Sequence, residues 1–341
     1  MNRPGNRKRP TMKDVARAAG VSFKTVSRVI NGEAGVSDLL RDRVNDAISE
    51  LGYQPDERAR ILRSAQLSRT IGFIHSDIGN PFFSGIHRGL EDIALSRGFL
   101  IVSGSSDEDP VRTEALVRTF ASRRVDGLAV VPTGDSPSLD QEIAHGTPVV
   151  FIDREPGRQG DLVLSDHRGG ARAATTHLID AGHTRIAFLG DRRYLYSAAE
   201  RLGGYHDALA AARLSTEWVV TDLVSPDAAE AATHRLMSAP EVERPTALFA
   251  AQNYLTEGAV RALHALGLQQ SVALVGFDDL EMGDVIEPGI TVVPQDAREL
   301  GRRAGELLLR RIDGESGPLL REELPLQLIE RGSGEIPCRS D

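Results

Sequence analysis

The chain of 341 residues contains a single cysteine, Cys338, so it cannot form an intramolecular disulfide or a cluster of thiolate metal ligands. It also lacks any run of about 18 apolar residues, the length that a membrane-spanning helix needs. The first ten residues, MNRPGNRKRP, have no apolar stretch after their charges, which argues against a secretory signal. We therefore expect a protein without membrane contact that stays in the cytoplasm.

Sequence motifs of common enzyme classes are missing as well. The chain has no GxxxxGK[ST], HExxH or GxSxG motif, and no GxGxxG follows its first predicted strand. Its nine histidines are scattered without the spacing of metal ligands. The sequence thus predicts no enzymatic activity, no metal site and no cofactor.

Charge is distributed unevenly along the chain. Residues 1–69 contain 14 Lys and Arg against 8 Asp and Glu, whereas residues 70–341 contain 26 against 41. A basic first fifth joined to an acidic remainder favours a protein that brings one end to a polyanion such as DNA. Membrane surfaces are also anionic, but the basic part has no amphipathic helix with bulky apolar anchors.

Residues 11–31, TMKDVARAAGVSFKTVSRVIN, predict two short helices joined by a tight turn at Gly20. Thr11 and Asp14 have the spacing of a capping box at the start of the first helix. Ser22 can cap the second helix. This arrangement is typical of a helix-turn-helix element.

The second of these helices has two different faces. Its apolar residues recur at helical spacing and are expected to point inward: Val26, Val29 and Ile30. Its exposed face consists of Phe23, Lys24, Ser27 and Arg28. Such a face fits the DNA major groove, while an ordinary amphipathic helix pair with a solvated face is the alternative.

The same residues resemble a known family. KDVARAAGVSFKTVSRVIN, then VS at 36–37 and ELGYQP at 50–55, is similar to the headpiece of the LacI/GalR family of bacterial transcription regulators. The resemblance continues in order through DIGNPFFSGIHRGLEDIA, RRVDGLAVVP, GHTRIAFLG and LVGFDD, and so covers nearly the whole chain. It implies a repressor that binds double-stranded operator DNA and responds to a small polar effector, such as a sugar or a nucleoside.

Carried over by position, the resemblance places Phe23, Lys24 and Arg28 at base edges in the major groove. The planar guanidinium of Arg28 can donate to O6 and N7 of one guanine, whereas Lys24 offers a less directional charge. Short polar residues around the helix are expected to contact phosphates or support the turn: Ser22, Thr25, Ser27 and Asn31. One headpiece reads a half-site, so a near-palindromic operator requires a homodimer.

Residues 55–64, PDERARILRS, resemble the hinge helix that enters the minor groove in this family, with Ala59 and Leu62 as DNA contacts. A leucine inserted between base steps kinks the duplex. Asp56 and Glu57 depart from the uncharged or basic residues that are common there, although Asp56 can act as an N-cap. A flexible basic linker with an isolated leucine is the alternative.

From Thr70 onward, short apolar runs alternate with helical patterns, as in parallel sheets that are covered by helices on both faces. The pattern restarts at RIAFLGD, which predicts two doubly wound lobes with a cleft at the carboxyl ends of their strands. The predicted fold is therefore α/β. An all-α helix-turn-helix headpiece and a hinge helix precede a two-lobed core that the resemblance implies to be like periplasmic binding proteins.

The predicted domain organisation has five parts. Residues 1–10 are a disordered basic N-terminus, 11–54 the headpiece, 55–69 the hinge helix and linker, 70–333 the effector-binding and dimerisation core, and 334–341 a flexible tail. The N-terminal lobe comprises 70–166 and 297–322, and the C-terminal lobe 167–296 and 323–333. Helices at 82–97 and 254–266 are candidate dimer interfaces, and the tail has no leucine heptads for a coiled coil.

The resemblance places six residues in the cleft: Phe82, Phe83, Asp153, Arg201, Gln252 and Asp278. Carboxylates, a guanidinium and an amide beside aromatic rings suit a ligand with many hydroxyl groups, because a hydroxyl can donate to a carboxylate and accept from Arg or Gln. For a single carboxylate, a structural ion pair at a strand end is an equal alternative.

Departures from the family pattern leave the ligand open. Gln252 and Asn253 replace the more usual Asn-Asp pair, and Val224 and Ala297 stand where aromatic residues are frequent. His75 and His167 are unusual at their positions and receive no role. We expect the ligand to close the lobes and shift the dimer between two states of the hinge helices. A free-standing sugar-binding protein is an alternative, against which the headpiece argues.

Overall fold

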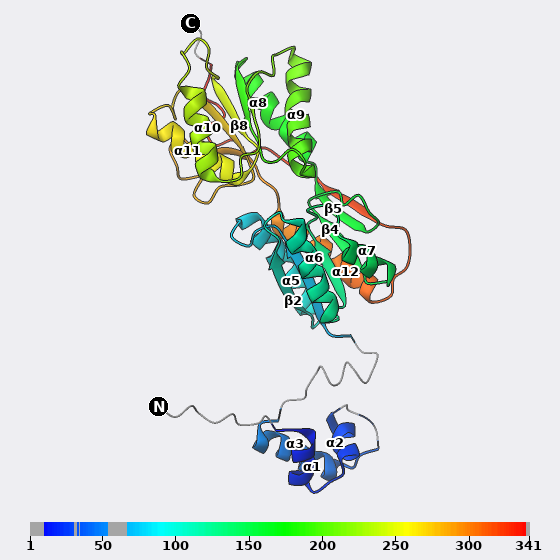
Figure 1. The fold of residues 1–341 in the computed structure, drawn as a ribbon. Helices are drawn as coiled ribbons and strands as arrows, with labels where there is room; N and C mark the ends of the chain where they lie inside the picture. The colour runs from blue at the N-terminus through cyan, green and yellow to red at the C-terminus, as the bar shows by residue number, and fades with distance from the viewer. Residues whose placement is uncertain (1–9, 31–32, 34, 54–66, 339–341) are drawn as a thin grey trace. The chain divides into compact units, whose positions relative to one another are not determined.

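The computed structural model describes residues 10–30, 33, 35–53 and 67–338. The chain divides into two compact units, the first ending at Ser68 and the second beginning at Arg69 (Figure 1). Among the described residues, none of the helices has the length and apolar character needed to cross a bilayer.

The described part of the first unit consists of α1 (Met12–Ala19), α2 (Phe23–Ile30) and α3 (Asp38–Leu51). These helices enclose a small core made of Val15, Ala19, Val26, Val44, Ala47 and Tyr53. The two predicted helices, α1 and α2, and the inward residues of α2 agree with the sequence analysis.

Most of the predicted helix caps are observed. The Thr11 hydroxyl accepts from the backbone N–H of Asp14 at 3.4 Å, and the Asp14 carboxylate accepts from the backbone N–H of Thr11 at 2.9 Å, so the capping box is confirmed. Gly20 ends α1 with a φ of 65°, a conformation that glycine adopts without strain. Ser37 precedes α3, but among the described residues its side chain makes no capping hydrogen bond.

The second unit contains a six-stranded sheet whose paired strands are all parallel. Across the sheet, the strands are β11 (Arg321–Leu324), β5 (Asp161–Ser165), β4 (Val149–Ile152), β3 (Gly127–Val130), β1 (Thr70–His75) and β2 (Leu100–Ser105). Helices α5 (Pro81–Ser96) and α12 (Ala297–Ile312) cover one face, and α6 (Pro110–Ser122) and α7 (Pro137–Ala144) cover the other (Figure 1). We call this the N-lobe.

A second parallel sheet has the order β10 (Thr291–Val293), β9 (Ala273–Phe277), β8 (Ala247–Ala250), β6 (Ile186–Leu189) and β7 (Val219–Val220). Helices α8 (His167–Asp180) and α9 (Tyr196–Ala212) cover one face, and α10 (Pro226–Met237) and α11 (Asn253–Ala265) the other. We call this the C-lobe. The prediction of two doubly wound lobes after an all-α headpiece is confirmed.

Burial on both faces explains the continuous apolar runs. In β1, Ile71 and Phe73 pack with α5 and α12, whereas Ile74 packs with α6 and α7. Alternate residues of a strand point to opposite faces, so a strand with helices on both sides has no position that favours a polar residue.

Within residues 67–338 the chain passes between the lobes three times, after β5, β10 and β11. After the last passage, the backbone N–H of Ile329 donates to the carbonyl of Val292 at 2.8 Å, so the segment that follows β11 pairs with the C-lobe. The carboxyl ends of strands from both sheets lie beside these crossings. The fold thereby brings side chains from both lobes to one place.

Three strands were not recognised in the sequence: β5, β10 and β11. They begin or end at lobe crossings, where the alternation of strand and helix that the sequence analysis relied on is broken. β7 consists of only two residues, Val219–Val220. It is an edge strand, and an edge strand can be short because only one side has a partner.

Residues 334–338, expected to belong to a flexible tail, instead pack on the C-lobe. The Glu335 carboxylate accepts from the Thr291 hydroxyl at 2.9 Å and lies 2.6 Å from His177 Nε2. The carbonyl of Ile336 lies 2.8 Å from His183 Nε2, and its side chain contacts the C-lobe core. The expectation was wrong for these residues because their partners are about 40 to 160 positions earlier in the chain.

Candidate functional site

The exposed face of α2 contains the side chains that the sequence analysis assigned to DNA. Phe23 is 44% exposed, an unusual state for a phenylalanine, and Lys24 is also exposed. The Ser22 hydroxyl accepts from the backbone N–H of Thr25 at 3.1 Å and so caps the helix, as predicted. Val26 is fully buried beneath them, which holds α2 on α1 and α3.

Arg28 is already engaged within the headpiece. Its Nε lies 3.4 Å from the Glu33 carboxylate, and the guanidinium also lies beside Gly35. An arginine that reads a base must exchange this partner for the base edge. Three further residues assigned to DNA, Asn31, Ala59 and Leu62, lie outside the described residues.

In the second unit, all six residues assigned to the cleft line one cavity of about 30 Å³ between the lobes. The lining residues are Asn80, Phe82, Phe83, Asp153, Arg154, Asp191, Ser197, Ala198, Arg201, Ala251, Gln252 and Asp278. N-lobe and C-lobe residues both contribute. The structure therefore brings together residues that lie up to about 200 positions apart in the sequence.

Two of the carboxylates have matching positions in the two lobes. Asp153 follows β4 and Asp278 follows β9, and their φ values of 69° and 66° are in the left-handed region. Such backbone is uncommon for residues other than glycine, and where it occurs it is often at a functional site. Each aspartate is thereby turned from its strand toward the cavity.

Arg201, from α9, connects several parts of the C-lobe. Its Nη1 donates to the carbonyl of Ala251 at 2.8 Å and lies 3.6 Å from Asp278 Oδ2, and the guanidinium carbon lies 3.9 Å from the centre of the Phe277 ring. The side chain of Gln295 donates to Asp278 Oδ1 at 2.7 Å. These contacts hold a cation and a carboxylate side by side at the cavity wall.

The two aspartates differ in their electrostatics. Burial acts to raise the pKa of Asp153, but the hydrogen bond from His167 and the neighbouring positive charges, Arg154 and Arg201 among them, outweigh it and lower this pKa. Burial raises the pKa of Asp278, and the Arg201 charge offsets this only in part. Asp153 is therefore a firm anion, whereas Asp278 is more easily protonated.

The sequence analysis missed several residues of the cavity wall. Arg154 donates to both carboxylate oxygens of Glu108 at 2.7 Å, and its Nε lies 3.3 Å from Asp153 Oδ2. Asp191, beyond the end of β6, has a pKa raised by burial. Charged residues directly after buried strands are a signal that would have identified both.

Two further contacts join the lobes beside the cavity. Asn80 Nδ2 donates to Asn253 Oδ1 at 3.2 Å, and Asn253 Nδ2 donates to Asn80 Oδ1 at 2.9 Å. The Tyr254 hydroxyl donates to Asp77 at 3.1 Å, and burial together with this carboxylate raises the pKa of Tyr254 to about 12. The described arrangement of the lobes is stabilised by these bonds.

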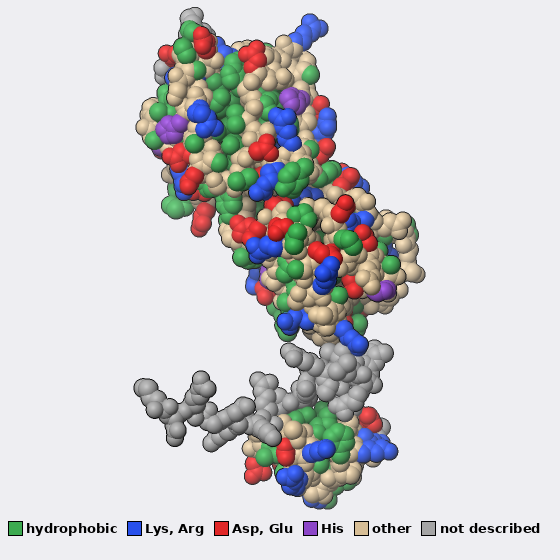
Figure 2. All heavy atoms as spheres, viewed as in Figure 1, with side chains coloured by type: hydrophobic (Ala, Val, Ile, Leu, Met, Phe, Trp, Pro, Cys, Tyr) green, Lys and Arg blue, Asp and Glu red, His purple; other side chains and the backbone are tan. Residues whose placement is uncertain are grey.

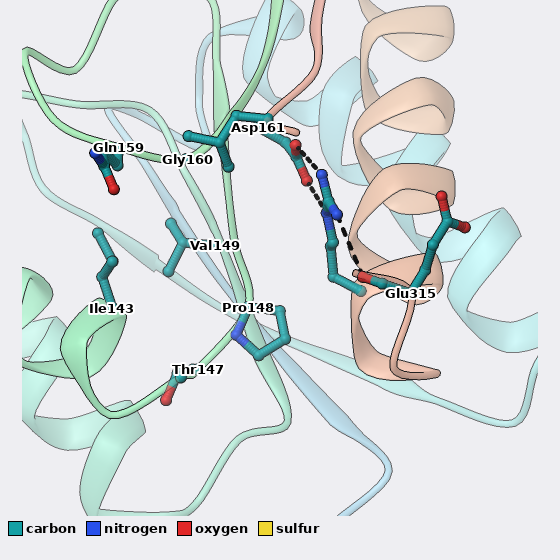
Figure 3. Close-up of a pocket in the computed structure, with 11 residues that line it drawn as sticks. Ile143, Thr147, Pro148, Val149, Gln159, Gly160, Asp161 and Glu315 are labelled. Carbon is teal, nitrogen blue, oxygen red and sulfur yellow. Dashed lines mark hydrogen bonds and ion pairs between the residues drawn. The ribbon is translucent and has the colours of Figure 1, made fainter. Parts of the chain in front are cut away.

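A larger cavity of about 280 Å³ lies within the N-lobe, at the start of β4 and β5. Figure 3 shows its charged wall, where Arg311 donates to both oxygens of Asp161 at 2.7 and 2.8 Å. Asp161 also accepts from the backbone N–H of Leu320, and Glu315 pairs with Arg310. These charges neutralise one another, so the wall offers a ligand little polar recognition, and the interlobe cavity is the better candidate site.

Over the visible face of the second unit, acidic and basic side chains are intermixed rather than gathered in one basic patch (Figure 2). Across the described part of the second unit many charged side chains are paired, for instance Arg302 with Glu299 and Arg298 with Asp92. This surface does not resemble one that binds a polyanion. The visible face gives no reason to move the DNA-binding role away from the headpiece.

Comparison with known proteins supports the same division of roles between the headpiece and the second unit. A model of bacterial regulatory proteins of the lacI family matches residues 11–56, and a model of periplasmic binding protein-like domains matches residues 175–334. The ribose operon repressor of Escherichia coli strain K12 is 36% identical over 330 residues, which are 95% of this chain and 99% of the repressor. The chain belongs to the LacI family of bacterial transcription regulators.

Solved structures agree with this LacI-family fold. The lac repressor dimer bound to operator and the anti-inducer ONPF matches with a TM-score of 0.84 and 29% identity, covering 96% of this chain and 99% of its own. The complex of the transcriptional regulator CelR with cellobiose matches with a TM-score of 0.70 and 34% identity, covering 95% and 100%. The family and the fold predicted from the sequence are confirmed.

Proposed function

We propose that this LacI-family regulator is a transcriptional repressor that binds operator DNA through α2 and whose DNA affinity depends on a small polar ligand between the lobes. The observation that supports this most is the match over 96% of the chain to a repressor dimer on its operator. We assign no catalytic role to the chain. Because its target is chromosomal DNA, we place its action in the cytoplasm.

On the DNA, we assign base contacts to Phe23, Lys24 and Arg28 and phosphate contacts to the short polar residues Ser22, Thr25, Ser27 and Asn31. Lys24 is exposed, and the Arg28 side chain is 37% exposed, so both can reach a groove. Ala59 and Leu62 are proposed as minor-groove contacts on the basis of the family resemblance.

For the ligand, we propose a monosaccharide, bound by Phe82, Phe83, Asp153, Arg201, Gln252 and Asp278. Near the cavity and among the described residues, Gln295 Oε1 is buried without a hydrogen-bond partner, and Arg154 Nε is buried with only an ion-pair contact to Asp153 Oδ2 at 3.3 Å. A buried acceptor or donor that is not hydrogen-bonded is costly, and a hydroxyl group can satisfy either. D-ribose is the first probe, because a ribose operon repressor is a relative over most of the chain.

Ligand binding must be linked to a change of conformation. The present cavity of about 30 Å³ holds about two water molecules, so a sugar cannot enter unless the lobes or the lining side chains move. The Asn80–Asn253 pair bridges the lobes at this point. A ligand that favours one lobe arrangement shifts the population, typically with a coupling of about 1 to 3 kcal/mol.

A homodimer is part of the proposal. β2 is the last strand of its sheet and presents Leu100 and Val102 to solvent at 62% and 40% exposure, beside Leu95 of α5 at 51%. In the C-lobe, Met282 and Val285 are 66% and 65% exposed. An open edge with exposed apolar side chains is a ready site for pairing with a second chain. Leu100→Lys is expected to give monomers in sedimentation analysis and to weaken operator binding.

The DNA-binding role is tested with the full chain and genomic DNA fragments. We expect an affinity that falls steeply with salt, and that falls less steeply after Lys24→Ala because one positive charge at the DNA interface is gone. No retention of fragments at low salt would contradict the repressor assignment. A thermal-shift screen of sugars and nucleosides tests the ligand class separately, since a ligand stabilises the state that it binds.

A further inference from the structure

His167 occupies the first crossing between the lobes. It is the first residue of α8, directly after β5 of the N-lobe, and only 2% of its surface is exposed. The side chain of Asp166 caps α8 by accepting from the backbone N–H of Gly169 at 2.7 Å. The imidazole therefore projects from a well-defined helix start.

Each ring nitrogen of His167 faces one residue of the candidate ligand site. Nε2 lies 2.9 Å from the carbonyl oxygen of Asp153 and 3.3 Å from its Oδ1. On the other side of the ring, Nε and Nη2 of Arg201 both lie 3.4 Å from Nδ1. One buried ring thus joins Asp153 of the N-lobe, by a hydrogen bond with its backbone carbonyl, to a C-lobe guanidinium.

The chemistry of these neighbours determines the position of the ring proton. A guanidinium can only donate, so Nδ1 must accept and carries no proton. A carbonyl and a carboxylate oxygen can only accept, so Nε2 must donate. The contact with Arg201 and the contact with Asp153 independently require the tautomer with the proton on Nε2. Each contact therefore favours the tautomer that the other contact needs.

Within residues 67–338, Arg201 contacts no second group that performs this task. Its Nη1 is used by the Ala251 carbonyl and Asp278, and Phe277 lies against the face of the guanidinium. Among the described residues, only His167 accepts from the Nε edge. Without that acceptor, the guanidinium is free to turn in its own plane and away from the cavity.

We propose that His167 is a positioning residue of the ligand site, which holds Asp153 and Arg201 in the orientation that binds one ligand across both lobes. This inference rests on the proposed function of the cavity. It assigns a role to a histidine for which the sequence suggested none. Its position at a crossing means that movement of the lobes acts directly on both bonds.

Three variants separate the two bonds. In His167→Asn, the amide oxygen can occupy the place of Nδ1 and accept from Arg201, but nothing reaches Asp153. In His167→Gln, the amide nitrogen can occupy the place of Nε2 and donate to Asp153, but the acceptor for Arg201 is lost. His167→Leu removes both bonds; because it can also unfold the lobe, the two amide variants decide the question.

The first measurement needs no ligand. Nitrogen-15 spectra of the full chain should show His167 with a protonated Nε2 and an unprotonated Nδ1. The Nε–H of Arg201 should exchange slowly with solvent in the wild type and in His167→Asn, and rapidly in His167→Gln. A proton on Nδ1, or equal protection of Arg201 in all variants, would overturn the proposal.

The second measurement is calorimetric titration with D-ribose. We expect each amide variant to bind D-ribose about ten- to hundredfold more weakly, the usual effect of leaving a buried charged group without one partner. Unchanged affinity in both variants would show that His167 does not position the site. If the wild type binds no D-ribose, the choice of ligand is wrong, while the ligand-free spectra still decide the role of His167.

Discussion

The two sites of this regulator are built in opposite ways. On α2 the proposed DNA contacts follow one another within a few residues and are exposed, with Phe23 at 44%. In the cavity, residues from distant parts of the chain are buried and bind one another, with Arg201 at 5% and Asp153 at 2%. The first site is a surface presented to a partner, and the second is part of the core.

This difference predicts different consequences of substitution. An exposed side chain on α2 can be removed without affecting the three-helix core, so only DNA binding should change. A side chain in the cavity is also a structural partner of its neighbours, so ligand binding and stability should change together. Four substitutions, from the largest expected effect to the smallest, test whether this contrast holds.

Arg201→Ala should have the largest effect. It leaves Asp278 and the Ala251 carbonyl without their buried cation, and breaking a buried pair of this kind typically costs about 3 to 5 kcal/mol. Denaturant unfolding of the full chain should show this loss for the core, together with loss of D-ribose binding. Lys24→Ala is the control and should leave core stability unchanged. If the core of Arg201→Ala is as stable as that of the wild type, the two sites do not respond to substitution in different ways.

Arg28→Ala tests the headpiece side of the contrast. It should relax the preference at one operator base pair by about 1 to 3 kcal/mol, because a bidentate contact to guanine is lost. Sites selected from a random DNA pool measure this preference. Arg17→Ala, on the exposed end of α1, is the matched control. An identical preference at every position would refute the assignment of Arg28, and lower core stability would contradict the independence of the two sites.

His75→Phe tests the comparison through the pH dependence of stability. All nine histidines lie beyond residue 69, so their titration acts on the second unit and not on the headpiece. Burial, with a further contribution from His87, lowers the pKa of His75 from 6.5 to about 4. Below pH 6.5 the unfolded chain binds this proton but the folded chain does not, so stability falls as pH decreases toward 4, by on the order of 2 kcal/mol. In unfolding curves recorded across that pH range, the stability of the variant should fall less with decreasing pH than that of the wild type. An equal pH dependence in the two proteins would show that His75 is not its source.

Thr11→Ala should have the smallest effect. It removes the hydroxyl of the capping box and should destabilise the start of α1 by about 1 kcal/mol. Amide hydrogen exchange in the full chain should show faster exchange in α1 and no change in the core. Lys13→Ala, on the same exposed turn, serves as the control. Faster exchange in both units would mean that they are not independent.

The headpiece could be predicted almost completely from the sequence. Thr11, Asp14 and Gly20 mark helix ends through contacts with residues three or four positions away, and the inward residues repeat with the helical period. What the sequence did not show is the pairing of Arg28 with Glu33. Glu33 lies beyond the end of α2, so helical spacing does not predict this pair.

The cavity could be predicted only in outline. The family resemblance selected six residues that the structure does bring together, but not Arg154, Asp191 or His167. Arg154 depends on Glu108, which lies 46 residues away, and Asn80 depends on Asn253, which lies 173 residues away. No local pattern encodes such pairs.

The sequence by itself determined the helix-turn-helix, the two series of strands and helices, and the basic and acidic division of the chain, because periodicity, capping and charge act over a few residues. Only the tertiary structure decided which polar side chains are buried together at the crossings between the lobes. Their protonation and orientation follow from partners that the fold supplies, and a buried group is defined by those partners rather than by its neighbours in the chain.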